Sequence, residues 1–373
     1  MSNWDSIARQ RWFMGKGRKV SGIKERDSIG LGGTKVSIVE VRFENGECDL
    51  YSVVEDESRM GAVLAEYFGE SFSRGALLHA KPLNAEQSNS AFYSKGKFFF
   101  KLYRRLQAGK HPEAEILEHL SQKAALGEPK ISPNFYGTFR HTDASTHQEY
   151  DIGILEEHVP DAKNAWDIFT DTSCADRAFY EKISRELGRT TATMHKALKD
   201  LEGTAPQAEE VPYDKLIGLL KANGREDLVE RVESIKLQQG QEILKPNVMV
   251  QQRIHGDYHL GQLLYKDGQF IVLDFEGEPT RTLEYRRRLR SPAADIAGML
   301  RSFAYASAVR NDKDFEQTVA EAFLLGYSEK CGIPVPQLKE EASPYVLGKA
   351  IYEACYELEF RPSWFWIPEK LLV

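Results

Sequence analysis

The spacing of hydrophobic residues changes once along this chain, and this change restricts the folds that it can adopt. Up to about residue 157, apolar residues come in short β-branched or aromatic runs such as 35–43, 48–54 and 151–155. Runs of this kind, bounded by turn residues, are typical of strands. Beyond residue 158, helical spacing predominates, over residues 177–198, 213–237, 292–308, 315–331 and 345–360. The sequence predicts a small β-rich half followed by a larger helical half.

Smaller signals refine both halves. In the first, residues 60–72 have helical spacing, residues 94–97 form a hairpin turn, and Pro112 opens a helix with acidic residues in its first turn. In the second, strands at 248–254 and 270–273 interrupt the helices, with Lys266-Asp267-Gly268 as the turn between them.

Composition excludes several classes of protein. The 373 residues carry a formal net charge of −7, which argues against a nucleic-acid partner. The four cysteines are scattered without a C-x-x-C pair, so neither a zinc site nor a disulfide framework is expected. There is no signal-like N-terminus and no stretch long enough to span a membrane. We expect a cytoplasmic protein.

The segment His255-Gly256-Asp257-Tyr258-His259-Leu260-Gly261-Gln262, followed by Asp274, carries the clearest chemical pattern. Phosphoryl transfer needs a carboxylate near the acceptor hydroxyl, ligands for a metal ion, and cations on the phosphates. Asp257 on a loop suits the first role, and Gln262 and Asp274 offer oxygen ligands for Mg²⁺. A hairpin between them would make Asp257 and Asp274 neighbours.

A metal site and an ion-paired core are the two other interpretations of this segment. His255, Asp257 and His259 alternate, as metal ligands on a strand can, but no fourth ligand is evident. Asp257 and Asp274 could also belong to an ion-paired core. His259 is expected to fix the loop by packing, with His255 bracing it.

The wider text resembles a known family. The order H-G-D, an amide five residues on, and an aspartate after a strand resemble aminoglycoside-phosphotransferase-like kinases, with Gln262 where that family has Asn. Residues 252–262, 273–279, 290–292 and 295–302 look more closely like the maltokinases, as do Tyr352-Glu353, Tyr356-Glu357, 361–364 and, near the start, 11–18. The resemblance implies an α+β, bilobal, protein-kinase-like fold, with an N-terminal β-rich cap (1–78), a small nucleotide-binding lobe (79–157) and a helical lobe (158–373).

On the nucleotide side no P-loop motif occurs, and Gly30 to Lys35 has the wrong spacing for one. Lys101, in an apolar strand, is expected to reach the phosphates of ATP. Glu113 and Glu115 compete to pair with Lys101, and the resemblance favours Glu115. The resemblance also assigns the phosphate-covering turn to Gln87, Ser88, Asn89 and Ser90, and the adenine hinge to the region of Glu157 and Val159.

For the acceptor, the candidate residues are His259, Glu276, Arg301, Glu353 and Trp364. Carboxylates, arginines and an aromatic ring are typical of sugar sites. Glu353, Glu357 and Arg361 share one helix face, so an ion-pair ladder is the competing interpretation, and we prefer it for Glu357. A glycoside hydrolase built on Glu276 and Glu278 is disfavoured, because two loop residues so close in sequence are unlikely to flank a glycosidic bond.

The resemblance implies an ATP- and Mg²⁺-dependent kinase that converts maltose to maltose 1-phosphate, as a monomer or homodimer. A glucosamine or other monosaccharide kinase is the nearest alternative. A non-catalytic, pseudokinase-type sensor, or a partner of trehalose synthase, is the alternative from a different class. Asp257, Gln262, Asp274 and Lys101 together favour a catalyst.

Overall fold

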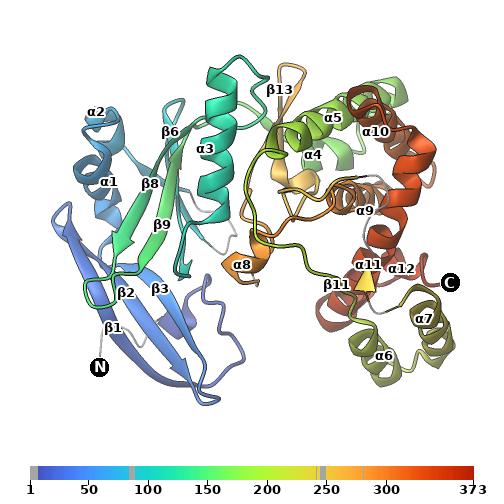
Figure 1. Ribbon diagram of the computed structural model, residues 1–373, viewed down its shortest axis with the longest axis horizontal. Helices are drawn as coiled ribbons and strands as arrows, with labels where there is room; N and C mark the ends of the chain where they lie inside the picture. The colour runs from blue at the N-terminus through green and yellow to red at the C-terminus, as the bar shows by residue number, and fades with distance from the viewer. Residues whose placement is uncertain (1–6, 84–88, 241, 244–248, 280) are drawn as a thin grey trace. The chain divides into compact units, whose positions relative to one another are not determined.

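The computed structural model describes residues 7–83, 89–240, 242–243, 249–279 and 281–373. The chain divides into two compact units, residues 1–161 and 162–373, which are described separately below. The predicted change from strands to helices is confirmed, since the first unit is built on two sheets and the second mainly on helices (Figure 1).

The first unit contains two antiparallel sheets, of order β1-β2-β3-β7 and β4-β5-β6-β9-β8. A hydrophobic cluster built on β2 and β3 includes Phe13 and Tyr51 from segments far apart in the sequence. The elements are η1 (Ile7–Arg9), β1 (Val20–Leu31), β2 (Thr34–Phe43), β3 (Cys48–Val54), η2 (Glu57–Arg59), α1 (Met60–Phe68), α2 (Arg74–Leu78), β4 (Lys81–Leu83), β5 (Ser90–Ser94), β6 (Phe98–Leu102), β7 (Arg105–Leu106), α3 (Pro112–Ala125), β8 (Phe135–Thr142) and β9 (Glu149–Glu156).

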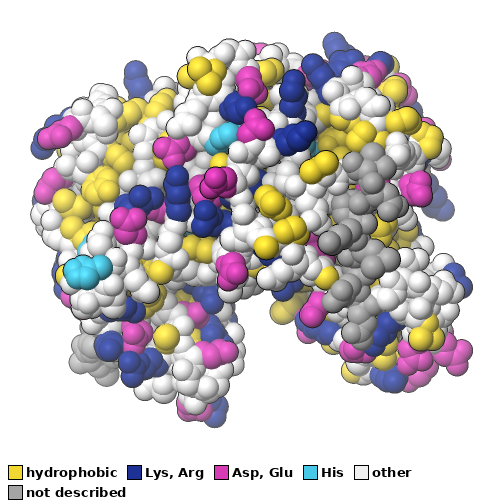
Figure 2. All heavy atoms as spheres, viewed as in Figure 1, with side chains coloured by type: hydrophobic (Ala, Val, Ile, Leu, Met, Phe, Trp, Pro, Cys, Tyr) yellow, Lys and Arg dark blue, Asp and Glu magenta, His cyan; other side chains and the backbone are white. Residues whose placement is uncertain are grey.

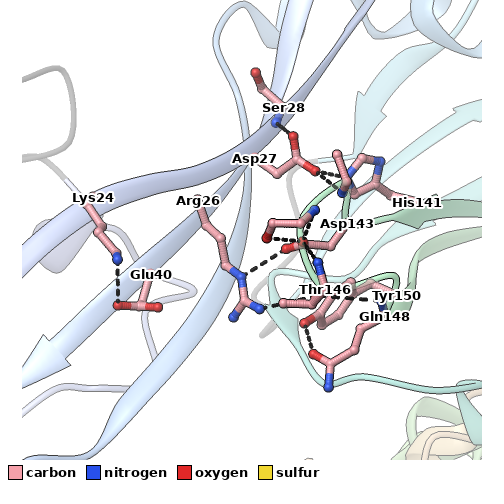
Figure 3. Close-up of polar contacts among 12 residues, drawn as sticks. Lys24, Arg26, Asp27, Ser28, Glu40, His141, Asp143, Thr146, Gln148 and Tyr150 are labelled. Atoms are coloured by element: carbon pink, nitrogen blue, oxygen red, sulfur yellow. Dashed lines mark hydrogen bonds and ion pairs between the residues drawn. The ribbon is translucent and has the colours of Figure 1, made fainter.

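Polar contacts tie the edge strand β1 of the first sheet to the β8–β9 turn of the second (Figure 3). Arg26 Nε donates to Asp143 Oδ2 over 2.9 Å, and Asp27 Oδ2 lies 2.9 Å from His141 Nε2. Hydrogen bonds from Ser145 and Thr146 hold the pKa of Asp143 far below its usual range. Charged and polar groups therefore fasten the two sheets together at this edge.

The second unit is helical around one short hairpin. Helices α5 and α10 pack backbone against backbone, because a Cβ on Gly188 or Gly326 would lie 2.0 Å or 1.9 Å from a carbonyl oxygen of the other helix. The elements are β10 (Lys163–Asn164), α4 (Ala165–Thr170), α5 (Arg177–Leu198), β11 (Glu209–Glu210), α6 (Tyr213–Ala222), α7 (Glu226–Gln239), β12 (Glu242–Ile243), η3 (Leu260–Gln262), β13 (Leu263–Lys266), β14 (Gln269–Val272), α8 (Leu283–Arg286), α9 (Ala293–Arg310), α10 (Phe315–Cys331), α11 (Val335–Phe360), η4 (Pro362–Trp364) and α12 (Trp366–Glu369).

Two predicted elements are wrong. The single helix over 213–237 is two helices, because Gly224 adopts a left-handed φ of 67° after α6 and breaks the helical path. The strand over 248–254 is absent from the described part of that range, where only Gln252 forms an isolated bridge, with Arg290. The partner of the second strand is instead β13, and Asp267 and Gly268 make the predicted turn with positive φ.

The surface carries charged side chains of both signs. On the face that Figure 2 shows, lysine and arginine side chains are interspersed with aspartate and glutamate over the described residues. Within the described residues, no helix is long and apolar enough to cross a membrane, and no group of three or more His, Cys, Asp or Glu forms a ready metal site. Cys48, Cys174, Cys331 and Cys355 are free.

Candidate active site

The loop 255–262 is fixed by the carboxylate of Asp295 on α9. Its Oδ2 accepts from the backbone N–H of His255 over 2.8 Å, and its Oδ1 accepts from that of Gly256 over 2.9 Å. Gly256 has a left-handed φ of 86°, a conformation that favours glycine. Asp295 therefore shapes the turn that leads directly into Asp257.

A buried hydrogen-bond chain supports Asp295. His195 on α5 lies with Nε2 3.0 Å from Asp295 Oδ2, and its Nδ1 is 2.8 Å from the hydroxyl of Tyr327 on α10. Burial raises the pKa of Asp295, but the contacts with His195, His255 and Gly256 together leave that pKa lowered. Burial keeps the pKa of Tyr327 well above its usual value, so its hydroxyl stays protonated beside His195. Three helices thus converge on one carboxylate.

His255 connects the loop to the end of the hairpin. Its Nε2 is 2.8 Å from the carbonyl oxygen of Leu273, and its Nδ1 accepts from the backbone N–H of Asp257 over 3.3 Å. This pair of contacts requires the neutral ring with its proton on Nε2. The hydrogen bond to Leu273, rather than a strand before His255, holds the loop against Asp274.

The hairpin brings together the two segments that carry the expected metal ligands. Gln262 ends η3 and its carbonyl accepts from Leu273 N–H over 2.9 Å, which places it next to the segment that carries Asp274. Asp274 adopts a left-handed φ of 61°, an uncommon conformation for a non-glycine residue that turns the chain sharply after β14. A carboxylate and an amide oxygen in this position suit a hard cation such as Mg²⁺.

His259 fixes the other side of the loop. Its Nδ1 accepts from Gly261 N–H over 3.0 Å at the start of η3. Burial lowers the pKa of His259, while the charges of Asp257 and Asp274 raise it less strongly. A neutral ring in contact with the loop backbone agrees with the loop-fixing interpretation.

A cavity of about 530 Å³ opens in the second unit and reaches Asp257. Its lining comes from β11 and the segment after it, residues 256–258, the segment around α8, the start of α9 and one face of α11. Asp257 lies there with a side chain that is 30% exposed. A carboxylate that is held by its own loop and open to a cavity of ligand size can meet an acceptor hydroxyl.

The remaining predicted acceptor residues lie elsewhere in the second unit, and none of them is among the described residues that line this cavity. Glu276 is buried, with Oε2 3.7 Å from Arg286 Nη1. Arg301 forms a 2.8 Å ion pair with Glu353. Trp364 stacks on Tyr305, with ring centroids 6.1 Å apart.

The acidic face of α11 is an ion-pair ladder in part. Glu357 is 1% exposed, and its Oε1 accepts from Tyr305 over 2.9 Å and from Arg361 over 2.6 Å. Burial raises the pKa of Glu353 despite the charge of Arg301. These pairs are built into the unit itself, so they would have to open before either carboxylate met a sugar.

In the first unit, Lys101 on β6 is 7% exposed and lies 3.1 Å from Glu113 Oε2. Tyr103 donates to the same oxygen over 2.8 Å. Glu115 is also buried, on the first turn of α3. Lys101 therefore pairs with Glu113, and the expected pairing with Glu115 stays a prediction.

The predicted phosphate-covering turn is described only in part, because Gln87 and Ser88 lie outside the described residues. Asn89 Oδ1 accepts from Arg104 N–H over 3.1 Å, and Ser90 Oγ accepts from Arg104 Nε over 2.9 Å. At the predicted hinge, Glu157 and Val159 follow β9, and Glu157 N–H donates to Asn134 O over 2.8 Å.

Several residues that matter to this geometry escaped the sequence interpretation. Arg104 is fully buried and joins the turn at Asn89 and Ser90 to Glu57, yet in sequence it was one more basic residue after a strand. Lys349 lines the cavity from one face of α11, together with Tyr352 and Tyr356, which the sequence interpretation named only as part of the resemblance. The helical spacing of these three residues was a usable signal for a shared face.

A sequence profile of the phosphotransferase enzyme family matches residues 79–330, which is more than half of the chain. The chain belongs to this family. Among its curated relatives, the glucosamine kinase of Mycolicibacterium smegmatis is 24% identical over 327 residues, covering 78% of this chain and 78% of the relative. The glucosamine kinase of Streptacidiphilus jiangxiensis is 24% identical over 331 residues, covering 79% and 71%.

Solved structures agree on the fold. A glucosamine kinase in complex with glucosamine, ADP and inorganic phosphate matches with a TM-score of 0.65 at 16% identity, covering 99% of this chain and 98% of that one. An amicoumacin kinase in complex with AMP-PNP and Ca²⁺ matches with a TM-score of 0.51 at 13% identity, covering 79% and 88%. The predicted α+β, aminoglycoside phosphotransferase-like kinase fold is confirmed.

Proposed function

We propose that this phosphotransferase is an ATP- and Mg²⁺-dependent kinase that phosphorylates a hydroxyl group of a sugar. The observation that carries the proposal is the 255–262 loop, which presents Asp257 to a cavity while the adjoining hairpin sets Gln262 beside the segment of Asp274. Family membership and the curated relatives named as glucosamine kinases support it.

In the proposed reaction, Asp257 accepts a hydrogen bond from the acceptor hydroxyl, orients it and takes its proton as the oxygen attacks the γ-phosphorus of ATP. ADP leaves with the pair of electrons of the broken bond. Gln262 and Asp274 would hold Mg²⁺, which neutralises phosphate charge when bound. Lys101 would bind phosphate oxygens, with Glu113 or Glu115 orienting its side chain.

The identity of the sugar is a finer proposal. The relatives make glucosamine the first acceptor to test. Maltose, with formation of maltose 1-phosphate, rests on the sequence resemblance alone, and so does an association with trehalose synthase. A sensor without catalytic activity is disfavoured because the proposed base is open to the cavity.

The test is ADP release by the purified chain with ATP and Mg²⁺, measured with glucosamine, glucose and maltose and without any sugar. The phosphorylated product would be identified by phosphorus NMR. We expect sugar-dependent release well above the rate without sugar, and its loss when Mg²⁺ is chelated. Equal release with and without every sugar would refute the proposal, and Mg²⁺-dependent ATP binding without turnover would then favour a sensor.

A further inference from the structure

Lys349 lies beside the proposed catalytic carboxylate, inside the cavity that reaches it. Its Nζ is 3.7 Å from Asp257 Oδ1, and each of the two side chains is 30% exposed. Both residues line the cavity. The roles described above for phosphoryl transfer make no use of Lys349, although it stands where the acceptor must enter.

The position of Lys349 restricts the charge of the acceptor. A hydroxyl that donates to Asp257 must come within hydrogen-bond distance of that carboxylate. Substituents on the neighbouring ring carbons then lie within about 9 Å of the ammonium group of Lys349, since one hydrogen bond and one step around the ring separate them from Asp257. At this range, two cations in a partly exposed site repel each other enough to weaken binding by about tenfold or more.

The other charges of the cavity do not compensate for Lys349. Of the six carboxylates among the described lining residues, Asp257 lies beside Lys349, and four others already have a basic partner within this unit. Those four pairs are Glu278 with Arg281, Glu209 with Arg290, Glu359 with Lys215, and Asp295 with His195. The sixth, Glu210, is exposed at the rim. Four of the six carboxylates therefore already have a basic side chain beside them, and Lys349 offsets the charge of Asp257.

The remaining lining suits an uncharged sugar. Tyr345, Tyr352, Tyr356 and Phe360 contribute aromatic surface along one side of α11. Tyr352 and Tyr356 are 50% and 42% exposed, which leaves their rings available to a ligand. Aromatic rings pack on the C–H faces of sugars, and tyrosine hydroxyls exchange hydrogen bonds with sugar hydroxyls.

We propose that Lys349 makes this site selective for an uncharged sugar and disfavours an acceptor with an ammonium group next to the reacting hydroxyl. This inference rests on the proposed sugar kinase function and narrows it. It also separates this chain from the relatives that are named glucosamine kinases, since the free amine of glucosamine is the group that Lys349 would repel.

The test compares glucose with glucosamine, which carries an ammonium group in place of one hydroxyl of glucose. Both sugars are measured with the wild-type chain and with the variants Lys349→Arg, Lys349→Gln and Lys349→Glu. The ratio of kcat/KM for glucose to that for glucosamine is measured, together with the dissociation constants of both sugars by calorimetry. We expect the wild type to favour glucose and Lys349→Arg to keep the ratio. Lys349→Gln should shift the ratio toward glucosamine by about tenfold, and Lys349→Glu should shift it further.

Lys339→Gln is the matched control, because Lys339 lies on the same helix, is half exposed, and pairs only loosely with Glu321 at 4.0 Å. It should leave the ratio unchanged. A ratio that stays constant across the three Lys349 variants, or a wild type that favours glucosamine, would overturn the inference. Charge-dependent binding without any turnover would count against the kinase function alone. Absence of binding to glucose and glucosamine would refute the inference, and absence of binding to maltose as well would refute both proposals.

Discussion

The 255–262 loop and the cavity face of α11 both contribute to the proposed site, but they are built differently. The loop is anchored by a buried carboxylate, Asp295, which accepts two backbone hydrogen bonds and is itself supported by His195. The α11 face presents side chains that are about a third to a half exposed, such as Lys349 and Tyr352. A loop that is anchored on a buried carboxylate can hold one geometry for phosphoryl transfer, whereas an open helix face can change its side chains without disturbing the fold.

The largest effect on kcat is expected for Asp257→Asn, a change in the loop that should leave the stability of the chain nearly unchanged. Asp257→Asn removes the proton acceptor but preserves the shape of the side chain, so kcat should fall by about 10²–10⁴-fold. Because the side chain of Asp257 is 30% exposed and opens to the cavity, the free energy of unfolding should change by less than about 1 kcal/mol. Steady-state kinetics and thermal unfolding provide the two measurements. Retention of kcat within a few-fold would remove Asp257 from the proposed mechanism.

Asp295→Asn should affect both properties. The NH₂ group of asparagine would face one of the N–H groups that now donate to the carboxylate. Two donors would then oppose each other, and the buried network would break. We expect the free energy of unfolding to drop by about 3 kcal/mol and kcat to fall by about 10²-fold. Asp312→Asn is the control, since Asp312 forms an outer ion pair with Arg177, and it should cost less than about 1 kcal/mol. Equal effects of the two variants would contradict the anchoring role.

The hydrogen-bond network around Asp295 also predicts how the stability of the chain changes with pH. The pKa of Asp295 is lowered in the folded chain, so its carboxylate contributes stability above its unfolded pKa of about 3.9, and this contribution is lost as the pH falls further through the folded pKa. Stability measured by urea unfolding should therefore decline below about pH 4 in the wild type. The decline should be shallower in Asp295→Asn, which has no such group to protonate.

A third comparison concerns backbone packing behind the loop. A Cβ on Gly298 would lie 2.5 Å from the carbonyl oxygen of Tyr258, so Gly298→Ala should push α9 away from the loop. We expect a loss of about 1–3 kcal/mol in stability and a moderate loss of kcat. Gly218→Ala on α6 meets nothing within 4 Å and should instead stabilise the chain by about 0.5–1 kcal/mol. If the two variants behave alike, close packing at Gly298 does not position the loop.

Local patterns were enough to predict much of the fold. The helices α5 and α10 have the predicted bounds, because their apolar spacing is long and ends at clear signals. The strand predicted before His255 was wrong because β-branched residues such as Val248 and Val250 suggested a ladder, whereas the hydrogen-bond partner of β14 lies after Gln262. Local propensity cannot show which of two nearby segments pairs with a strand.

The residues that support the site from distant parts of the sequence were harder to predict. Asp257, Gln262 and Asp274 lie within one short stretch, so their motif was visible. Asp295 and His195 come from separate helices, and nothing local marks either as a partner of the loop. Lys349 was missed for a different reason, since a lysine on a helix is ordinary until the fold shows that it lies beside Asp257.

The smallest expected effect tests the buried lysine of the first unit. Glu113 is 2% exposed and lies 3.1 Å from Lys101, so Glu113→Gln should weaken the orientation of that lysine and raise the KM for ATP by about five- to tenfold. Glu115→Gln is the matched variant two residues away on the same helix, and the family resemblance had favoured Glu115. We expect it to change KM less, because Glu113 also accepts a hydrogen bond from Tyr103 and is thereby held toward β6. A larger effect at Glu115 would support the assignment from the resemblance. It would also mean that the pair between Lys101 and Glu113 must open when nucleotide binds.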